Sequence, residues 1–212
     1  MRRRNFLKKL IGGILGWTIG LGSSLLFFTQ GRTDSRQANI YLSGFRHGSL
    51  LRPPGAVEEL LFLRRCIQCF QCVEVCPIQA INVLDSLSSN IANTPFLIPR
   101  EKGCNLCMKC NQVCPSGALL KIGNDRNAIK RKVKMGVAVV DELTCYSYIK
   151  RAICGACYKV CPFPDEAIEI QGSYFRPTVN KEKCVGCGLC EEICPTKTKS
   201  IRIDLIRTMT NT

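Results

Sequence analysis

One stretch decides the fold of this chain: Cys66-Ile67-Gln68-Cys69-Phe70-Gln71-Cys72-Val73-Glu74-Val75-Cys76-Pro77. Its cysteine spacing returns along the sequence, so that the 212 residues contain sixteen cysteines in four groups of four, with none left over. We name the groups by their order, as motif one at residues 66–77, motif two at 104–115, motif three at 145–162 and motif four at 184–195. Repetition of one short pattern indicates one kind of site that is built four times.

Motifs one, two and four read C-x2-C-x2-C-x3-C-P, the run that holds cubane iron–sulfur clusters in bacterial ferredoxins. The first three cysteines bind three irons of one cluster, and the fourth binds the neighbouring cluster. Proline after the fourth cysteine fixes φ and removes a backbone donor, which turns the chain toward that neighbour. We therefore expect four 4Fe-4S clusters whose iron is bound by all sixteen cysteines, namely Cys66, Cys69, Cys72, Cys76, Cys104, Cys107, Cys110, Cys114, Cys145, Cys154, Cys157, Cys161, Cys184, Cys187, Cys190 and Cys194.

Structural zinc and a disulfide framework are the alternatives to iron–sulfur clusters. Zinc sites usually pair two C-x2-C or Cys/His hooks across a long loop and have no use for the C-x3-C-P ending. Sixteen cysteines also permit eight disulfides in an oxidising compartment, although four copies of one spacing disfavour that reading.

Motif three departs from the pattern because eight residues, instead of two, separate Cys145 from Cys154. Without Cys145 the site would have three cysteines, which is typical of a 3Fe-4S cluster or an open iron. An Asp-Glu-Leu-Thr sequence precedes Cys145, as in other ferredoxin motifs, so we interpret Cys145 as a ligand on an expanded loop. The loop is expected to be a solvated surface, with a partner contact as the alternative.

The fold class we expect is α+β, a repeated bacterial-type ferredoxin with two pseudo-twofold modules of two clusters each and an N-terminal hydrophobic helix. Each motif should supply a short helix carrying its last cysteine, and a helix over Val57–Leu63 should lead into motif one. A β-hairpin is expected over residues 167–179, with its turn at Gln171-Gly172-Ser173. The expected strands span residues 80–84, 95–98, 118–122, 136–140, 167–170, 175–179 and 200–203.

The formal charge of +14 invites a nucleic-acid or anionic-membrane partner, but the clusters change that reading. Five basic residues lie within residues 2–9, and subtracting these five from +14 leaves +9 for the rest. Four oxidised clusters with their thiolates contribute roughly −8, so the loaded domain is close to neutral. We therefore expect no nucleic-acid partner, since no recognition motif accompanies the charge.

The amino terminus contains Arg3-Arg4-Asn5-Phe6-Leu7-Lys8, a match to the twin-arginine export signal, followed by the uncharged stretch 10–28. That stretch is 19 residues long, about 28 Å as a helix, which is enough to cross a bilayer. Residues 1–31 are thus expected to be an export signal that either remains as a membrane anchor, which we favour, or is cleaved. Residues 32–50 are expected to be a linker, which contains the single histidine, His47, and residues 51–212 the four-cluster domain. Export of a folded protein places that domain on the periplasmic side.

The chain resembles the NapG/MauM family of ferredoxin-type proteins over about residues 51–203. The resemblance rests on the export signal, the widened motif three and four further stretches: Leu51-Arg52-Pro53-Pro54-Gly55-Ala56, Cys114-Pro115-Ser116-Gly117-Ala118-Leu119, Met135-Gly136-Val137-Ala138-Val139-Val140 and Arg176-Pro177-Thr178-Val179. It implies a periplasmic electron carrier between a membrane quinol-oxidising partner and a soluble redox enzyme, nitrate reductase in the NapG branch. The segment Cys194 to Ile201 is longer than the usual C-P-x-x-A-I, so the geometry of that turn is open.

Two arrangements of the motifs are compatible with the spacing. Motif one pairs with two and three with four in a sequential arrangement, or one with four around two with three in a nested arrangement. We favour the nested arrangement, because the C-P-S-G-A then G-V-x-V-V-D phrase between motifs two and three is shared with four-cluster subunits of molybdenum oxidoreductases. Proximity of Cys76 to Cys184 or to Cys104 distinguishes the two.

Electron transfer without substrate chemistry is the expected function, since the sequence holds no nucleophile–base array, phosphate loop or G-x-G-x-x-G. Two alternatives stay open. One is an electron-transfer subunit of a stable molybdenum-type oxidoreductase complex. The other is an assembly factor with structural clusters.

Overall fold

The structure is a computed structural model that describes residues 50–84 and 91–205, all of which fall within one compact unit. The expected export signal, the N-terminal hydrophobic helix, His47 and nearly all of the linker lie outside the described residues. Within the described ranges, no helix is both long enough and apolar enough to span a membrane.

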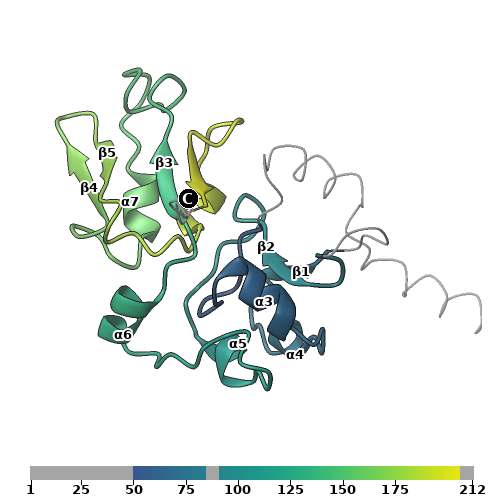
Figure 1. Cartoon of the computed structure of the whole chain (residues 1–212). Helices are drawn as coiled ribbons and strands as arrows, with labels where there is room; N and C mark the ends of the chain where they lie inside the picture. Colours follow the sequence, from purple (N-terminus) through teal and green to yellow (C-terminus); the bar gives the residue numbers. More distant parts are fainter. Residues whose placement is uncertain (1–49, 85–90, 206–212) are drawn as a thin grey trace, which may run out of the picture. The chain divides into compact units, whose positions relative to one another are not determined.

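Short helices and strands alternate along the described chain, which confirms the α+β class (Figure 1). The elements are α3 (Glu59–Arg65), α4 (Gln71–Glu74), β1 (Ile81–Val83), β2 (Pro95–Leu97), α5 (Lys109–Gln112), α6 (Arg126–Lys132), β3 (Val137–Val140), α7 (Ala156–Val160), β4 (Ile168–Gln171), β5 (Arg176–Val179), α8 (Leu189–Ile193) and β6 (Ile201–Asp204).

Three two-stranded antiparallel sheets connect the motifs. The strand after motif one, β1, pairs with the strand before motif two, β2, in the register Ile81 to Leu97. The strand before motif three, β3, pairs with the strand after motif four, β6, and β4 pairs with β5 as the predicted hairpin (Figure 1). The strands thus divide the domain into a first module, residues 51–122, and a second module, residues 133–205, with α6 in the connection.

The prediction of a strand over residues 118–122 is wrong. This segment forms only an isolated bridge, Ala56 to Leu119, with backbone hydrogen bonds of 3.1 Å from Val57 N to Ala118 O and 2.7 Å from Leu120 N to Gly55 O. The partner segment contains Pro53 and Pro54, which have no N–H to donate, so the ladder does not extend.

The helices of the motifs also differ from the prediction, because each carries the third cysteine of its motif instead of the last. In motifs three and four the fourth cysteine, Cys161 or Cys194, is the C-cap of the helix and has an extended or non-helical backbone. The following proline disfavours helical φ and ψ at the residue before it, so the helix has to end there. The helix expected over Val57–Leu63 is confirmed as α3, two residues further along.

Helix α6 was not predicted, although it has a local signal. The Asp125 side chain caps its first turn by accepting a 2.8 Å hydrogen bond from Ala128 N. Lys130, Arg131 and Lys132 lie in its last turn, where cations interact favourably with the helix dipole. Ala128 and Ile129 face inward and join the core.

The core is small and is built partly from the cysteines themselves. The main cluster of buried residues includes Leu51 and Leu97 from the first module, Phe163 and Ile168 from the second, and several motif cysteines from both. A second cluster lies around Phe62, which is fully buried. With so little aliphatic volume, the modules depend on whatever the cysteines bind.

Candidate iron–sulfur cluster sites

Three hollows in the structure are each lined by four cysteines, three from one motif and one from another. Cys66, Cys69 and Cys72 line the first hollow together with Cys114. A second is lined by Cys145, Cys154, Cys157 and Cys194, and a third by Cys184, Cys187, Cys190 and Cys161. We call these quartet one, quartet three and quartet four, after the motif that supplies three members.

Quartet two consists of Cys104, Cys107, Cys110 and Cys76. Burial raises the pKa of the Cys104 thiol to about 11; a hydrogen bond from the Leu106 backbone opposes the rise, and the neighbouring Cys107 and Cys76 add to it. Burial likewise raises the pKa of Cys110 to about 12, with Cys104 and Cys107 as close neighbours. All sixteen cysteines are free, and all are now placed in four quartets.

The nested arrangement is wrong, because Cys76 lies beside Cys104 and Cys114 beside Cys66. Cys161 lies beside Cys184, and Cys194 lines the hollow of motif three, so the pairing is sequential in both modules. Chain entropy favours this outcome: Cys104 follows Cys76 by 28 residues and Cys184 follows it by 108, so the longer closure costs about 1 kcal/mol more. The β1–β2 pair then holds motif two next to motif one.

The motif loops wrap around the hollows through residues in the left-handed region. Gln68 and Phe70 in motif one have φ of 56° and 59°, and Leu106 and Met108 in motif two have 58° and 57°. Such a backbone costs a non-glycine residue on the order of 1 kcal/mol or more. It also turns successive N–H groups toward a common point, which is how backbone nests bind anions and iron–sulfur clusters.

The quartets are not arranged as sites for a single metal ion. Among the described residues, no three His, Cys, Asp or Glu side chains converge closely enough to hold a single metal ion. A structural zinc would need four sulfurs at about 2.3 Å from one point, a convergence that is not found among the described residues.

Several buried thiols of the quartets are costly to ionise without a cation. Burial raises the pKa of Cys157 and of Cys187 to about 12, and each also has other cysteines of its quartet as charged neighbours. Iron–sulfur ligation requires the thiolate form, so bound cationic iron supplies the compensating charge.

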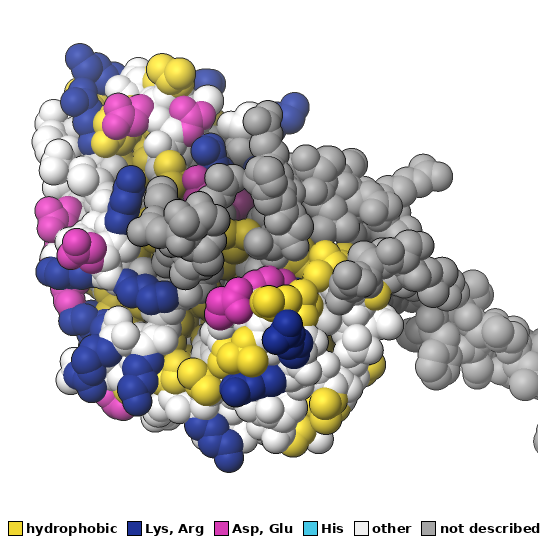
Figure 2. Space-filling model, viewed as in Figure 1, with side chains coloured by type: hydrophobic (Ala, Val, Ile, Leu, Met, Phe, Trp, Pro, Cys, Tyr) yellow, Lys and Arg dark blue, Asp and Glu magenta, His cyan; other side chains and the backbone are white. Residues whose placement is uncertain are grey.

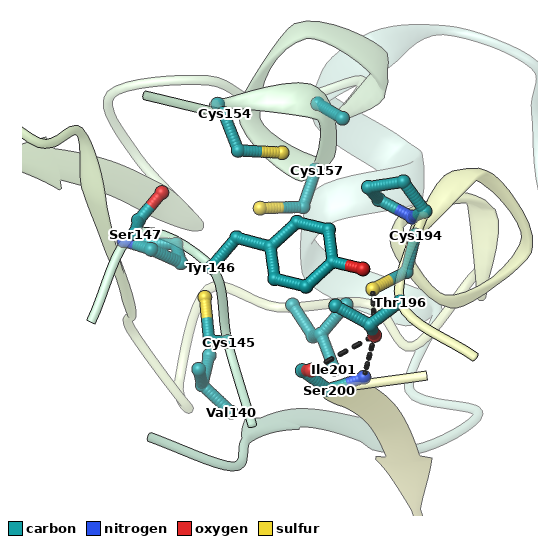
Figure 3. Close-up of a pocket in the computed structure, with 14 residues that line it drawn as sticks. Val140, Cys145, Tyr146, Ser147, Cys154, Cys157, Cys194, Thr196, Ser200 and Ile201 are labelled. Atoms are coloured by element: carbon teal, nitrogen blue, oxygen red, sulfur yellow. Dashed lines mark hydrogen bonds between the residues drawn. The ribbon is translucent and has the colours of Figure 1, made fainter. Parts of the chain in front are cut away.

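Motif three brings Cys145 to its quartet in spite of the long loop (Figure 3). The ring of Tyr146 borders the same hollow, and Arg151 lies 5.2 Å from its centroid. Tyr148 donates a hydrogen bond to Pro177 O at 3.3 Å. Both tyrosines are therefore engaged by the fold. Residues 149–153 of the loop are exposed, as expected of a solvated loop, whereas Ser147 is buried and the two tyrosines are half-buried.

A buried hydroxyl in this hollow has no partner among the described residues. Ser147 is one of the residues that line the hollow of quartet three, it is only 1% exposed, and its Oγ makes no hydrogen bond to the described residues. Buried polar atoms are rarely left unsatisfied. A sulfide-rich cluster in the hollow offers the missing acceptor, so this atom fits the expected cofactor.

The turn after Cys194, whose geometry the sequence left open, is organised by a second hydroxyl. Thr196 Oγ1 accepts hydrogen bonds of 2.8 Å from the backbone N–H and from the hydroxyl of Ser200 (Figure 3). Both acceptor sites of the oxygen are then used, which leaves its own proton for Cys194 Sγ at 3.1 Å. At Cys76, the fourth cysteine of motif one, the backbone N–H of Ala80 donates a hydrogen bond to the sulfur at 3.4 Å.

Two arginines that the sequence did not single out lie next to the quartets. Arg52 stacks 4.6 Å from the centroid of Phe62 and lowers the pKa of Cys66 against the larger effect of burial. Arg126 stacks at the same distance on Phe163 and acts in the same direction on Cys161. Each also pairs with a glutamate, Arg52 with Glu59 at 2.6 Å and Arg126 with Glu166 at 3.4 Å, which weakens its field.

The other charged side chains form no single-sign patch on the face in Figure 2, where basic, acidic and apolar side chains are interspersed.

Two modules, each with two cysteine quartets on short helices and hairpins, define a ferredoxin-type iron–sulfur protein. The comparisons with known proteins agree with this class.

The 4Fe-4S dicluster domain family matches the chain twice, over residues 65–118 and 150–198. Each match covers two consecutive motifs, in accord with sequential pairing. The second match begins after Cys145, which the structure nevertheless places in quartet three. The chain therefore carries 4Fe-4S clusters.

Curated relatives are identical to this chain at one third or more of the aligned positions. The ferredoxin-type protein NapG of Escherichia coli is 34% identical over 87% of this chain and 77% of its own length. The methylamine utilization ferredoxin-type protein MauM of Methylophilus methylotrophus is 36% identical over 79% of this chain and 73% of its own. NapG of Haemophilus influenzae is 36% identical over 87% of this chain, which spans only 64% of that relative. The chain belongs to the NapG/MauM family of ferredoxin-type proteins.

Replacing the Thr196 hydroxyl tests its role. In a Thr196→Val variant we expect the cluster of quartet three to have a lower reduction potential, because the lost hydrogen bond stabilised the more negative, reduced state. A hydrogen bond of about 1 kcal/mol corresponds to a shift on the order of 40 mV. Potentiometric EPR measures the shift, and Thr196→Ser, which keeps the hydroxyl, is the matched control. An unchanged potential in Thr196→Val at equal iron content would contradict this role.

Proposed function

We propose that this chain is an electron carrier whose sixteen cysteines bind four 4Fe-4S clusters, one in each quartet. The observation that carries the proposal is the assembly of every cysteine into a complete set of four ligands. A complete set leaves each cluster without an open iron for substrate, which suits electron transfer and not substrate chemistry. The unpartnered Ser147 hydroxyl and the raised thiol pKa values support the same cofactor.

The partners we propose are a membrane protein that oxidises quinol, as donor, and a redox enzyme on the periplasmic side, as acceptor. This assignment rests on membership of the NapG/MauM family and on the functions that the resemblance implies. In the NapG branch the acceptor would be periplasmic nitrate reductase, and in the MauM branch a different enzyme. The low net charge of the loaded domain, in which basic residues nearly cancel the negative charge of the clusters, is compatible with transient docking to several partners.

Quinol-linked reduction tests the carrier role. Anaerobically loaded protein, with about sixteen irons per chain, is mixed with membranes of its own source and a quinol-generating substrate. We expect the visible absorbance of the clusters to bleach, and to recover when the acceptor enzyme and its substrate are added. The control is the same chain freed of iron by chelator, which should show no bleaching.

Reduction of the loaded protein by dithionite but not by the membranes would overturn the carrier role. That result would favour the assembly factor with structural clusters. Recovery of the chain only as a complex with a catalytic subunit, stable in high salt, would favour the subunit of a molybdenum-type oxidoreductase.

We further propose that the chain is exported folded by the twin-arginine route and remains on the periplasmic side of the cytoplasmic membrane, with residues 10–28 as an anchor. The support is the order of Arg3, Arg4, Phe6 and Leu7 before an uncharged stretch. Clusters inserted in the cytoplasm require a pathway that carries folded protein.

Conservative replacement of the two arginines tests this route. In an Arg3→Lys, Arg4→Lys variant the positive charge is kept, so a charge-only signal would still work. We expect the loaded variant to accumulate in the cytoplasm, as measured by cell fractionation, while an Arg2→Lys variant is exported normally. Periplasmic recovery of the double variant would rule the route out.

A further inference from the structure

The two modules touch through a backbone hydrogen bond between cysteines of different quartets. The N–H of Cys104, in quartet two, donates to the carbonyl of Cys187, in quartet four, at 2.7 Å. The two cysteines are also electrostatic neighbours. The sulfurs of the two quartets are thus joined by the covalent bonds of two residues and a single hydrogen bond.

The backbones at this contact are too close for a side chain. A Cβ added at Gly103 would lie 2.6 Å from Leu189 N, and one added at Gly188 would lie 2.6 Å from Pro99 Cβ. A Cβ at Gly186 would meet Gly136 N at 2.3 Å. Real Cβ contacts essentially never come below 3.0 Å, so glycine is required at Gly103 and Gly188 for the modules to approach this far, and at Gly186 for the packing of motif four against Gly136 of its own module.

Backbone conformation alone does not explain the glycines of motif four. Gly186 and Gly188 have φ of 73° and 82°. The equivalent positions have the same left-handed conformation in motifs one and two, where they are Gln68 and Phe70, and Leu106 and Met108. Motif four therefore uses Gly188 for close approach to Pro99 of the first module, and Gly186 for close approach to Gly136 of its own module.

Side chains of α8 fix the contact from both sides. Glu192 Oε2 accepts a 2.7 Å hydrogen bond from Gly103 N, directly before Cys104. The buried Glu191 accepts from Ile203 N at 2.7 Å and lies 3.8 Å from Arg100. The approach of the two quartets is thus held by specific bonds.

We propose that electrons cross between the modules at the Cys104–Cys187 hydrogen bond, so that the four clusters work in the order one, two, four, three. This inference rests on the proposed function. Within each module the next link is already present: α4 packs against α5 and α7 against α8. Cys110 has Cys72 as a neighbour, and Cys190 has Cys157.

At each step one electron leaves one cluster and one electron is gained by the next, with no atom or proton transferred. Electron tunnelling slows steeply with distance, so the short link between quartets two and four sets where the modules exchange electrons. Quartets one and three are then the ends of the relay. Quartet one includes the exposed Cys69 between the exposed Ile67 and Phe70, and the exposed Ile153 precedes Cys154 of quartet three.

Two glycine variants with matched controls test the relay. Gly103→Ala and Gly188→Ala both push the modules apart at the contact. Gly123→Ala is the control for Gly103→Ala. The nearest atom to a Cβ added at Gly123 is at the flexible end of the Asp125 side chain, which can move aside. Gly117→Ala is the control for Gly188, because Gly117 also has a positive φ, 70°, and nothing lies within 4 Å of its added Cβ.

The measurements are iron per chain, the magnetic coupling between reduced clusters by EPR, and the rate at which an electron from a photoreductant spreads over the clusters. For the two contact variants we expect full iron, weaker coupling between quartets two and four, and a several-fold slower spread than in the controls. Full iron with coupling and rate equal to the controls would overturn the relay order. The proposed order also requires magnetic coupling between the clusters of quartets two and four in the unsubstituted protein. If sixteen irons are bound and this coupling is absent, the order is overturned. Low iron in the unsubstituted protein would instead count against the proposed function.

Discussion

The exchange of fourth cysteines between neighbouring motifs is the constraint on which the rest of this structure depends. Each quartet is incomplete without a cysteine from the other motif of its module, as Cys114 completes quartet one and Cys76 quartet two. Two motifs are thereby tied together by both clusters at once. Helices of four or five residues and strands of three or four would not be stable alone, and this tie lets them form a module.

The loops around the quartets store strain that the clusters offset. Non-glycine residues such as Gln68, Phe70, Leu106 and Met108 occupy the left-handed region, and several buried thiols have a raised pKa. Both costs are offset when iron and sulfide are bound. The backbone N–H groups then bind an anionic cluster, and the thiolates bind cationic iron. Folding and cluster insertion are therefore coupled.

The local features were predictable from the sequence, and the long-range ones were not. Cysteine spacing identified all sixteen members of the quartets, and the β4–β5 hairpin followed from the polar, glycine-containing turn at Gln171-Gly172-Ser173. Motif pairing could not be predicted because C-x2-C-x2-C-x3-C-P is the same in nested and sequential arrangements. The distance of Cys76 from Cys104 along the chain, and the strand-like segments between them, were the available signals. The prediction of a strand at residues 118–122 was wrong because the segment that pairs with it contains two prolines. This pairing partner is set by the tertiary structure and could not be read from the local sequence.

The cysteine motif also does not predict which other side chains contact the quartets. Thr196 and Ser147 gain their roles from burial against quartet three, and Arg52 and Arg126 from stacking on Phe62 and Phe163. Glycine in motif four looked like ordinary loop composition until the packing against Pro99 and Gly136 gave it a reason. The short contact between the modules depends on Gly188, which packs against Pro99, and on Gly103, which packs against Leu189.

Anomalous scattering of iron from crystals of the loaded protein tests the central claim most directly. Sequential exchange predicts four separate iron centres, with Cys76 at the centre bound by Cys104, Cys107 and Cys110, and Cys114 at the centre bound by Cys66, Cys69 and Cys72. Iron that joins Cys76 to Cys184, or centres with a single metal ion each, would contradict it.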